Sequence, residues 1–452
     1  MKQLSERTFY IYNFGCKVNQ EEGGALAALF VASGWQQVAD PGQAGLIMDN
    51  TCTVTQIADK KARNMIRRFA KEQPSAILAV CGCYAQRAAG EIAALGGVDI
   101  ICGVDQRRQL PQLAEAWSAA ETGATAPGAA AGTRLTVAVS DVRQAHEFQR
   151  IAAHSRQSRS RAYLKIEDGC DQFCHYCIIP HVRGPVRSLP LDQALEQGRE
   201  LVDQGHRELV LSGIHIGAYG LDLGQPQALP QLIGQLCRLP GLFRLRLGSI
   251  EPQQFTPALL DCLERQPKLC PHLHIPLQSG CDRTLREMGR HYDTAFYARL
   301  LGELRQRLGE VAVTTDLMVG YPGETEEDFQ SSLAFCLECG FSDMHIFPYS
   351  RRSGTPAAQR PDQVAQGLKA RRAALLAAAA ADMSRAYGES WLGRELTMLV
   401  EDRAELEGRS WLRGHSGNYL TLLLPWDDGP ETLRRVRCEQ WSKNGMLASL
   451  CP

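Results

Sequence analysis

Three cysteines stand close together in one short segment of the chain: Cys170, Cys174 and Cys177, at C-x-x-x-C-x-x-C spacing. Thiolates are the ligands that iron–sulfur clusters use, and three of them can hold three corners of a cubane cluster. The fourth iron is then open for a group of a substrate, as the open position of a catalytic zinc is. A structural zinc site is the alternative, but it usually needs a second pair of Cys or His ligands, and none stands nearby at such spacing.

This segment resembles the cluster loop of the radical S-adenosylmethionine (SAM) enzymes. In those enzymes the open iron binds the amino and carboxylate groups of SAM, and an electron from the cluster breaks a carbon–sulfur bond of SAM. The radical that is released can abstract hydrogen from an unactivated carbon. The resemblance implies that Cys170, Cys174 and Cys177 are catalytic ligands of a 4Fe–4S cluster and that Tyr176 packs against the adenine of SAM.

Three further cysteines follow apolar runs in the first hundred residues: Cys16, Cys52 and Cys83. Short apolar runs separated by helical segments predict a doubly wound parallel sheet, in which the loops at the carboxyl ends of the strands form the ligand crevice. A second cluster site is one interpretation. Buried cysteines that act as small hydrophobes are the other, and Cys81 and Cys102 occupy similar places. The predicted strands are Phe9–Tyr12, Leu46–Met48, Ala76–Val80 and Val98–Ile101.

The residues around these cysteines resemble the three cysteine motifs of the radical SAM methylthiotransferase family: Gly15–Asn19, Asn50–Thr55 and Gly82–Gln86. In that family an N-terminal domain of this kind precedes a radical SAM domain. The match selects Cys83 over Cys81, and it implies that Cys16, Cys52 and Cys83 hold a second 4Fe–4S cluster. That cluster carries a methylated sulfur to the substrate carbon in the family.

Residues 156–388 repeat a strand–helix pattern and predict a partial (β/α)6 barrel, whose site lies at the carboxyl ends of the strands. The cluster loop follows the first strand, as this rule requires. The resemblance implies that later strand ends bind SAM, through Ser212, Gly213, Glu251, Gln278 and Gly320. The predicted strands are Tyr163–Glu167, Glu208–Ile214, Phe243–Ile250, His272–Leu277, Val311–Val319 and Asp343–Pro348.

The whole chain is therefore predicted to be an α/β protein with an iron–sulfur domain at residues 7–118, a linker at 119–155, a radical SAM core at 156–388 and a small β-barrel at 389–452. A long helix over Pro361–Tyr387 is expected before the barrel. The barrel matches the TRAM domain of the family in position, although its basic residues do not outnumber its acidic ones. The segment Arg143–Lys165 has six basic residues and one acidic residue, which predicts either a solvated face or a strip that contacts phosphates.

The overall composition is that of a globular protein in a reducing compartment. The chain has 452 residues, a net charge of −1 and 16 cysteines, a share well below that of secreted disulfide scaffolds. Its start lacks the apolar run of a signal peptide, and no stretch offers the ~20 apolar residues of a membrane span. We expect a cytoplasmic protein without a membrane partner.

Within the family, the segments Thr51–Thr55, His215–Gly220 and Ser249–Pro252 look most like the branch that methylthiolates C2 of N6-threonylcarbamoyladenosine at tRNA position 37. The alternatives are isopentenyladenosine in tRNA and an aspartate of a ribosomal protein. A non-catalytic iron–sulfur protein that binds RNA is an alternative of another class. The expected partners are the anticodon loop of tRNA and an external electron donor, and the source of the sulfur is unknown.

Overall fold

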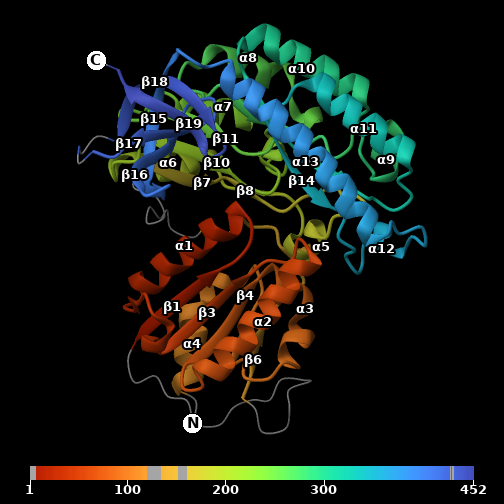
Figure 1. The fold of residues 1–452 in the computed structure, drawn as a ribbon. Coiled ribbons are helices and arrows are strands. Elements are labelled where there is room, and N and C mark those ends of the chain that lie inside the picture. The colour runs from red at the N-terminus through yellow and green to blue at the C-terminus, as the bar shows by residue number, and fades with distance from the viewer. Residues whose placement is uncertain (1–6, 120–133, 151–159, 428, 430–431, 452) are drawn as a thin grey trace.

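The computed structural model describes residues 7–119, 134–150, 160–427, 429 and 432–451. Figure 1 shows three parts: an N-terminal sheet covered by helices, a central set of strands and helices, and a C-terminal β-barrel beside the central part. Most of residues 119–155, predicted as a linker, lie outside the described residues, while β6 and a short turn lie inside them. The boundaries of the predicted domains stay predictions.

The N-terminal part is a parallel sheet of six strands in the order β2-β1-β3-β4-β5-β6. Helices α1 and α4 pack on one face through Phe30 and Trp117, and α2 and α3 pack on the other through Ile66 and Ile92. The predicted doubly wound sheet is therefore confirmed. Its elements are β1 (Thr8–Asn13), α1 (Lys17–Ala32), β2 (Gln36–Gln37), β3 (Leu46–Thr51), α2 (Gln56–Glu72), β4 (Ile77–Gly82), α3 (Cys83–Ala93), β5 (Ile100–Cys102), α4 (Leu110–Ala119) and β6 (Thr136–Ala138).

The central part contains two three-stranded parallel sheets, β7-β10-β11 and β12-β13-β14, which are joined by a bridge between Ser249 and His274. Together they form the predicted open barrel of six strands. The strands are β7 (Arg161–Lys165), β10 (Glu208–Ser212), β11 (Arg244–Leu247), β12 (His272–His274), β13 (Ala312–Val319) and β14 (Asp343–Pro348), and a small antiparallel pair adds β8 (Glu167–Asp168) and β9 (Arg187–Ser188).

Helices cover the outside of this open barrel, and their leucines fill one continuous core with the strands. The last helix begins at Gln366, later than predicted, because residues 361–365 form a loop whose Asp362 carbonyl accepts from Gly323 N. The helices are α5 (Ile179–Arg183), α6 (Leu191–Asp203), α7 (Ala228–Leu236), α8 (Pro257–Arg265), α9 (Asp282–Glu287), α10 (Thr294–Leu308), α11 (Glu326–Cys339), α12 (Pro356–Gln359) and α13 (Gln366–Glu389).

The C-terminal part is a closed barrel in the order β15-β16-β17-β19-β18, as predicted for this region. It docks through the loop at residues 415–420. The ring of Tyr419 stacks on His272 and His415, with ring centroids 4.6 and 4.9 Å apart, and the Arg246 guanidinium lies 4.7 Å from its centroid. The strands are β15 (Glu395–Leu406), β16 (Arg409–His415), β17 (Thr421–Pro425), β18 (Leu433–Ser442) and β19 (Gly445–Leu450).

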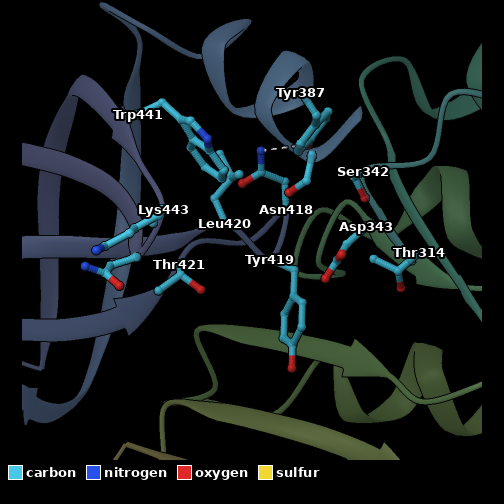
Figure 2. Close-up of a pocket in the computed structure, with 13 residues that line it drawn as sticks. Thr314, Ser342, Asp343, Tyr387, Asn418, Tyr419, Leu420, Thr421, Trp441 and Lys443 are labelled. Carbon is cyan, nitrogen blue, oxygen red and sulfur yellow. Dashed lines mark hydrogen bonds between the residues drawn. The ribbon is translucent and has the colours of Figure 1, made fainter. Parts of the chain in front are cut away.

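This docking loop lies at the amino ends of the central strands. Arg244, the first residue of β11, donates to His415 O at 2.9 Å, and Arg246 donates to Ser416 O and Gly417 O at 3.0 Å each. A cavity of about 210 Å³ remains between the two parts, and Figure 2 shows Tyr419 pointing from it toward the central strands. The C-terminal barrel therefore occupies the end of the open barrel opposite the cysteine loop.

Candidate functional site

The cysteine loop leaves the carboxyl end of β7 and is held in a tight shape by its own backbone. Cys170 N donates to Gly184 O at 3.1 Å, and Cys177 N donates to Cys174 O at 2.9 Å. Gly169 has a φ of +93°, and a Cβ there would lie 1.9 Å from Pro185 O, so the turn into the loop requires glycine. Phe173 also has a positive φ of 44° and is exposed.

Two side chains with nitrogen atoms, Arg290 and His215, approach the sulfurs of this loop. Arg290 Nη1 donates to Cys174 Sγ at 3.2 Å, while its other nitrogens contact Glu251 and Tyr292. His215 Nδ1 lies 4.0 Å from Cys170 Sγ. Burial, together with the neighbouring Cys174, raises the pKa of Cys177 to about 12. Thiolates in such surroundings need a bound positive centre, so this donor set fits an iron–sulfur cluster.

The residues predicted to bind SAM gather around the same mouth of the barrel. Ser212 ends β10 and Gly213 follows it, and Glu251, Gln278 and Gly320 come after β11, β12 and β13. Gln278 and Gly320 have positive φ values of 65° and 68°. Tyr176 packs on the buried cluster that includes Met288 and Met318, and its contact with adenine stays a prediction.

Three buried polar atoms at this mouth have no hydrogen-bond partner among the described residues: Glu167 Oε1, His215 Nε2 and Gln278 Oε1. Buried polar atoms are rarely left unpaired, so these atoms indicate the place of a polar ligand. A cavity of about 260 Å³ lies beside the loop and is lined in part by Asp171, His215 and Asp222. Binding of SAM at this mouth stays a prediction.

The second set of cysteines comes together at the carboxyl edge of the N-terminal sheet. Cys16 precedes α1, Cys52 follows β3 and Cys83 begins α3. The two sulfurs of Cys16 and Cys52 lie close enough to interact, and a hydrogen bond from the Cys52 thiol lowers the pKa of Cys16 below its usual value. A Cβ on Gly15 would lie 2.4 Å from Cys52 Cβ, so glycine is needed for this approach. The three sulfurs fit a cluster with one open iron, although their role as ligands stays a prediction.

Cys81 lies apart from this set. It is fully buried in β4 and packs with Cys102 in the core beneath α1 and α4, on the other face of the strand from Leu78 and Val80. Its Sγ donates to Asn50 Oδ1 at 3.7 Å. Burial raises the pKa of Cys81 well above its usual value, so it fits the small-hydrophobe interpretation.

Buried ion pairs connect the two cysteine sites, and the sequence did not reveal them. Glu22 on α1 accepts from Arg183 Nη1 at 2.5 Å, from Arg183 Nη2 at 2.9 Å and from Lys165 Nζ at 2.6 Å. Asp168, two residues before Cys170, accepts from Lys165 at 2.7 Å and from Arg183 at 3.1 Å. Charged residues that flank both cysteine motifs are the only signal that the sequence offers.

A second contact fixes the Cys52 loop to the central part. Arg352, which follows β14, donates to Thr53 Oγ1 and to Asp59 Oδ2 at 2.7 Å each. Gln56 N donates to Ser350 Oγ at 2.9 Å. Together with the contact of Glu21 with Ser212, these bonds place the N-terminal cysteines over the mouth of the open barrel, and Figure 1 shows α1 beside β8.

The basic strip at residues 143–165 is largely paired where it is described. Arg143 contacts Asp141, Arg150 contacts Glu196 and Arg161 contacts Glu401. Lys165 belongs to the buried ion pairs, while Arg156 and Arg159 lie outside the described residues. A contact of this strip with phosphates stays a prediction, and of its described basic residues only Arg143 is well exposed while Arg161 and Lys165 are largely buried in ion pairs.

The described residues contain neither a site for a single metal ion nor a membrane-spanning helix. Residues 7–119, 134–150, 160–427, 429 and 432–451 contain no group of three or more His, Cys, Asp or Glu that could hold one metal ion. A four-iron cluster has a different requirement, because each thiolate binds a different iron. No helix in the same residues is long and apolar enough to cross a membrane.

Comparisons with known proteins match this geometry. Residues 164–336 match the radical SAM superfamily, and residues 8–103 match the uncharacterized protein family UPF0004. The solved structure of the radical SAM methyltransferase TsrM from Kitasatospora setae, with cobalamin and a [4Fe-4S] cluster bound, covers 78% of this chain and 77% of its own. Its TM-score is 0.60 at 15% identity, which shows a shared fold. The protein is thus a radical SAM protein with an added N-terminal domain.

Relatives of higher identity define the family. The threonylcarbamoyladenosine tRNA methylthiotransferase MtaB of Bacillus subtilis is 36% identical over 92% of this chain and 90% of its own. The MtaB of Thermotoga maritima is 34% identical over 87% of each chain. The tRNA-2-methylthio-N(6)-dimethylallyladenosine synthase of Moorella thermoacetica is 32% identical over 98% of this chain and 99% of its own. The chain belongs to the radical SAM methylthiotransferase family, whose members use SAM and two 4Fe–4S clusters.

Proposed function

We propose that this enzyme transfers a methylthio group to C2 of N6-threonylcarbamoyladenosine at position 37 of tRNA. Two relatives with that substrate in their names, at 36% and 34% identity, support this choice over the relatives named for dimethylallyladenosine. The resemblance at Thr51–Thr55, His215–Gly220 and Ser249–Pro252 points to the same branch. An external electron donor is required, and because tRNA is the substrate we place the enzyme in the cytoplasm.

The observation that carries the proposal is that both cysteine sets face one mouth. Clusters bound there would supply the electron that cleaves SAM and the sulfur that is transferred. Side-chain contacts hold the two cysteine sets in these positions. Arg290 donates to Cys174, and Glu251 holds Arg290 in place. The contact of Glu21 with Ser212 holds α1 against the end of β10.

Several groups at the mouth are suited to bind a polar ligand without adding charge. Burial raises the pKa of Glu167 to about 8, so its carboxyl group is mostly protonated near neutral pH and its Oε2 accepts from His215 N at 2.6 Å. The unpaired His215 Nε2 and Gln278 Oε1 can bond the polar groups of SAM. The relatives named as tRNA methylthiotransferases and synthases disfavour the non-catalytic alternative.

Recognition of the tRNA is expected to depend on single-stranded bases. Bases of an anticodon loop can splay out into a protein pocket, whereas the edges of paired bases in an RNA helix are hard to read. Because the C-terminal barrel docks at the amino ends of the central strands, it is expected to contact a part of the tRNA distant from the modified base.

Mass spectrometry of tRNA nucleosides from a deletion strain tests this function. The methylthio form of threonylcarbamoyladenosine should be lost in the strain and restored by this chain, and a Cys174→Ala variant should not restore it. Loss of methylthio-isopentenyladenosine instead would contradict the substrate. An unchanged nucleoside profile with a missing methylthio-aspartate on a ribosomal protein would also contradict it.

A further inference from the structure

All three nitrogens of the Arg183 guanidinium group donate hydrogen bonds at the junction of the two cysteine sites. Its Nε donates to Cys83 Sγ at 3.3 Å, its Nη1 donates to Glu22 and Asp168, and its Nη2 donates to Glu22. The side chain is 1% exposed. Arg183 ends α5, six residues after Cys177, so one residue of the core loop touches the sulfur of a cysteine from the N-terminal site.

The charges around Arg183 do not balance. Two carboxylates, Glu22 and Asp168, face four cations at distances up to 3.9 Å. The cations are Arg107, Lys165, Arg183 and Arg187, and each is buried or nearly so. A buried excess of positive charge is costly unless a negative group compensates it.

Two further carboxyl groups lie close by but do not supply that compensation. Glu21 contacts the Ser212 hydroxyl, and Glu167 accepts from the backbone of His215. Burial raises the pKa of Glu21 to about 7 and that of Glu167 to about 8, so near pH 7 Glu167 is mostly neutral and Glu21 only partly ionised, which leaves an excess of at least one positive charge. A cluster held by three thiolates is an anionic group and would compensate the excess.

We infer that Arg183 is a positioning residue that joins the two cysteine loops and raises the reduction potential of the cluster bound by Cys16, Cys52 and Cys83. The inference rests on the proposed function, because it takes those cysteines as ligands. Positive charge and hydrogen bonds to sulfur stabilise the reduced, more negative state of a cluster. Glu22 and Asp168 fix the guanidinium, so the sulfur of Cys83 keeps a constant position relative to the loop at Cys170–Cys177.

The test uses the full chain with Cys170→Ala, Cys174→Ala and Cys177→Ala, which leaves one cysteine set to bind a cluster. After anaerobic reconstitution this parent should hold about four irons per chain. Its midpoint potential is measured by reductive titration followed by electron paramagnetic resonance. A parent that binds no iron would show that the ligand assignment is wrong, and the inference would fall with it.

Adding Arg183→Met to this parent should shift the midpoint to a more negative potential while the iron content stays the same. Arg183→Lys keeps the charge but loses the Nε donor, so it should cause a smaller shift in the same direction. If Arg183→Met does not fold, the double variant Glu22→Gln with Arg183→Met preserves the net charge of the ion pairs. It should still shift the midpoint to a more negative value through the lost N–H···S bond.

The matched control is Arg246→Met, since Arg246 is also a buried arginine that joins two parts of the chain and pairs with a carboxylate, Glu208, but it lies at the amino ends of the central strands, away from both cysteine sets. It should leave the midpoint unchanged. An intact cluster with an unshifted potential in the Arg183 variants would overturn the inference. An equal shift in the Arg246 variant would overturn it too, because the loss of any buried arginine would then have the same effect.

Discussion

At the scale of single residues, the position of a cysteine on its strand decides what it can do. Cys81 and Cys83 are separated by one residue, yet Cys81 lies in the core of the sheet and Cys83 lies beyond the end of β4, against Arg183. The carboxyl ends of parallel strands meet at one edge of the sheet, where the loops can bring distant residues together. Only Cys83 is therefore placed to join Cys16 and Cys52.

This difference predicts the outcome of two matched substitutions. Cys83→Ala should lower the iron content of the reconstituted chain from about eight to about four atoms, because one of two clusters loses a ligand. Cys81→Ala should keep both clusters and cost about 1–2 kcal/mol of stability through a small cavity. Iron and sulfide analysis measures the first effect and urea unfolding the second. Loss of iron in the Cys81 variant alone would reverse the assignment.

Asp49 is a buried carboxyl group whose two oxygens have no partner among the described residues. Burial raises the pKa of Asp49 to about 8, well above its value in the unfolded chain. The folded state thus binds one more proton between about pH 4 and 8, and the free energy of unfolding falls by about 1.4 kcal/mol per pH unit in that window. The contribution of Asp49 is constant above pH 8.

Asp49→Asn should remove this pH dependence. The variant should match the natural chain near pH 4 and become progressively more stable than it up to about pH 8. Urea unfolding of both chains at several pH values measures the difference. A difference that does not change with pH would show that Asp49 is ionised in the folded state.

At the scale of helices and strands, local sequence patterns predicted most of the central elements. The predicted strand Asp343–Pro348 is β14, and the predicted strand Val311–Val319 differs by one residue from β13, which is buried at all but one position. Four strands were missed: β2, β6, β9 and β19. β2 is an exposed pair of glutamines and β6 is only partly buried, so neither has an apolar pattern.

The part of the site that the sequence could not show consists of contacts between distant positions. Glu22 and Arg183 are 161 positions apart, and Arg352 and Thr53 are 299 apart. No regular sequence spacing predicts either contact, because each contact depends on how two parts of the chain dock. The cysteine motifs were recognisable because each is local, with its cysteines and the residues that flank them within a few positions.

The docking loop of the C-terminal barrel gives a prediction at this scale. Tyr419→Ala removes a ring that stacks on two histidines and an arginine, so it should cost about 2–4 kcal/mol. The segment between α13 and β15 should then be cut faster by proteases, because the barrel separates from the core more often. Tyr419→Phe, which keeps the ring, should retain most of the stability. Equal loss in both variants would contradict a role for stacking.

At the scale of the whole molecule, a different part of the chain packs against each end of the central strands. The C-terminal barrel binds the amino ends of its strands, and the N-terminal sheet covers the carboxyl ends through Glu21, Glu22 and Thr53. Sites of this fold lie at the carboxyl ends. The N-terminal part therefore covers the end where sites of this fold lie, while the C-terminal barrel leaves that end free.

This division of the molecule predicts that its two reactions can be separated. A chain with Cys16→Ala, Cys52→Ala and Cys83→Ala should still cleave SAM reductively to 5′-deoxyadenosine, because Cys170, Cys174 and Cys177 and the polar atoms of the barrel mouth are intact. It should form no methylthio product, because that product needs the second cysteine set. Chromatography of the SAM products and mass spectrometry of the tRNA measure the two reactions. Methylthio product from this variant would show that the sulfur reaches the tRNA without the N-terminal cysteines.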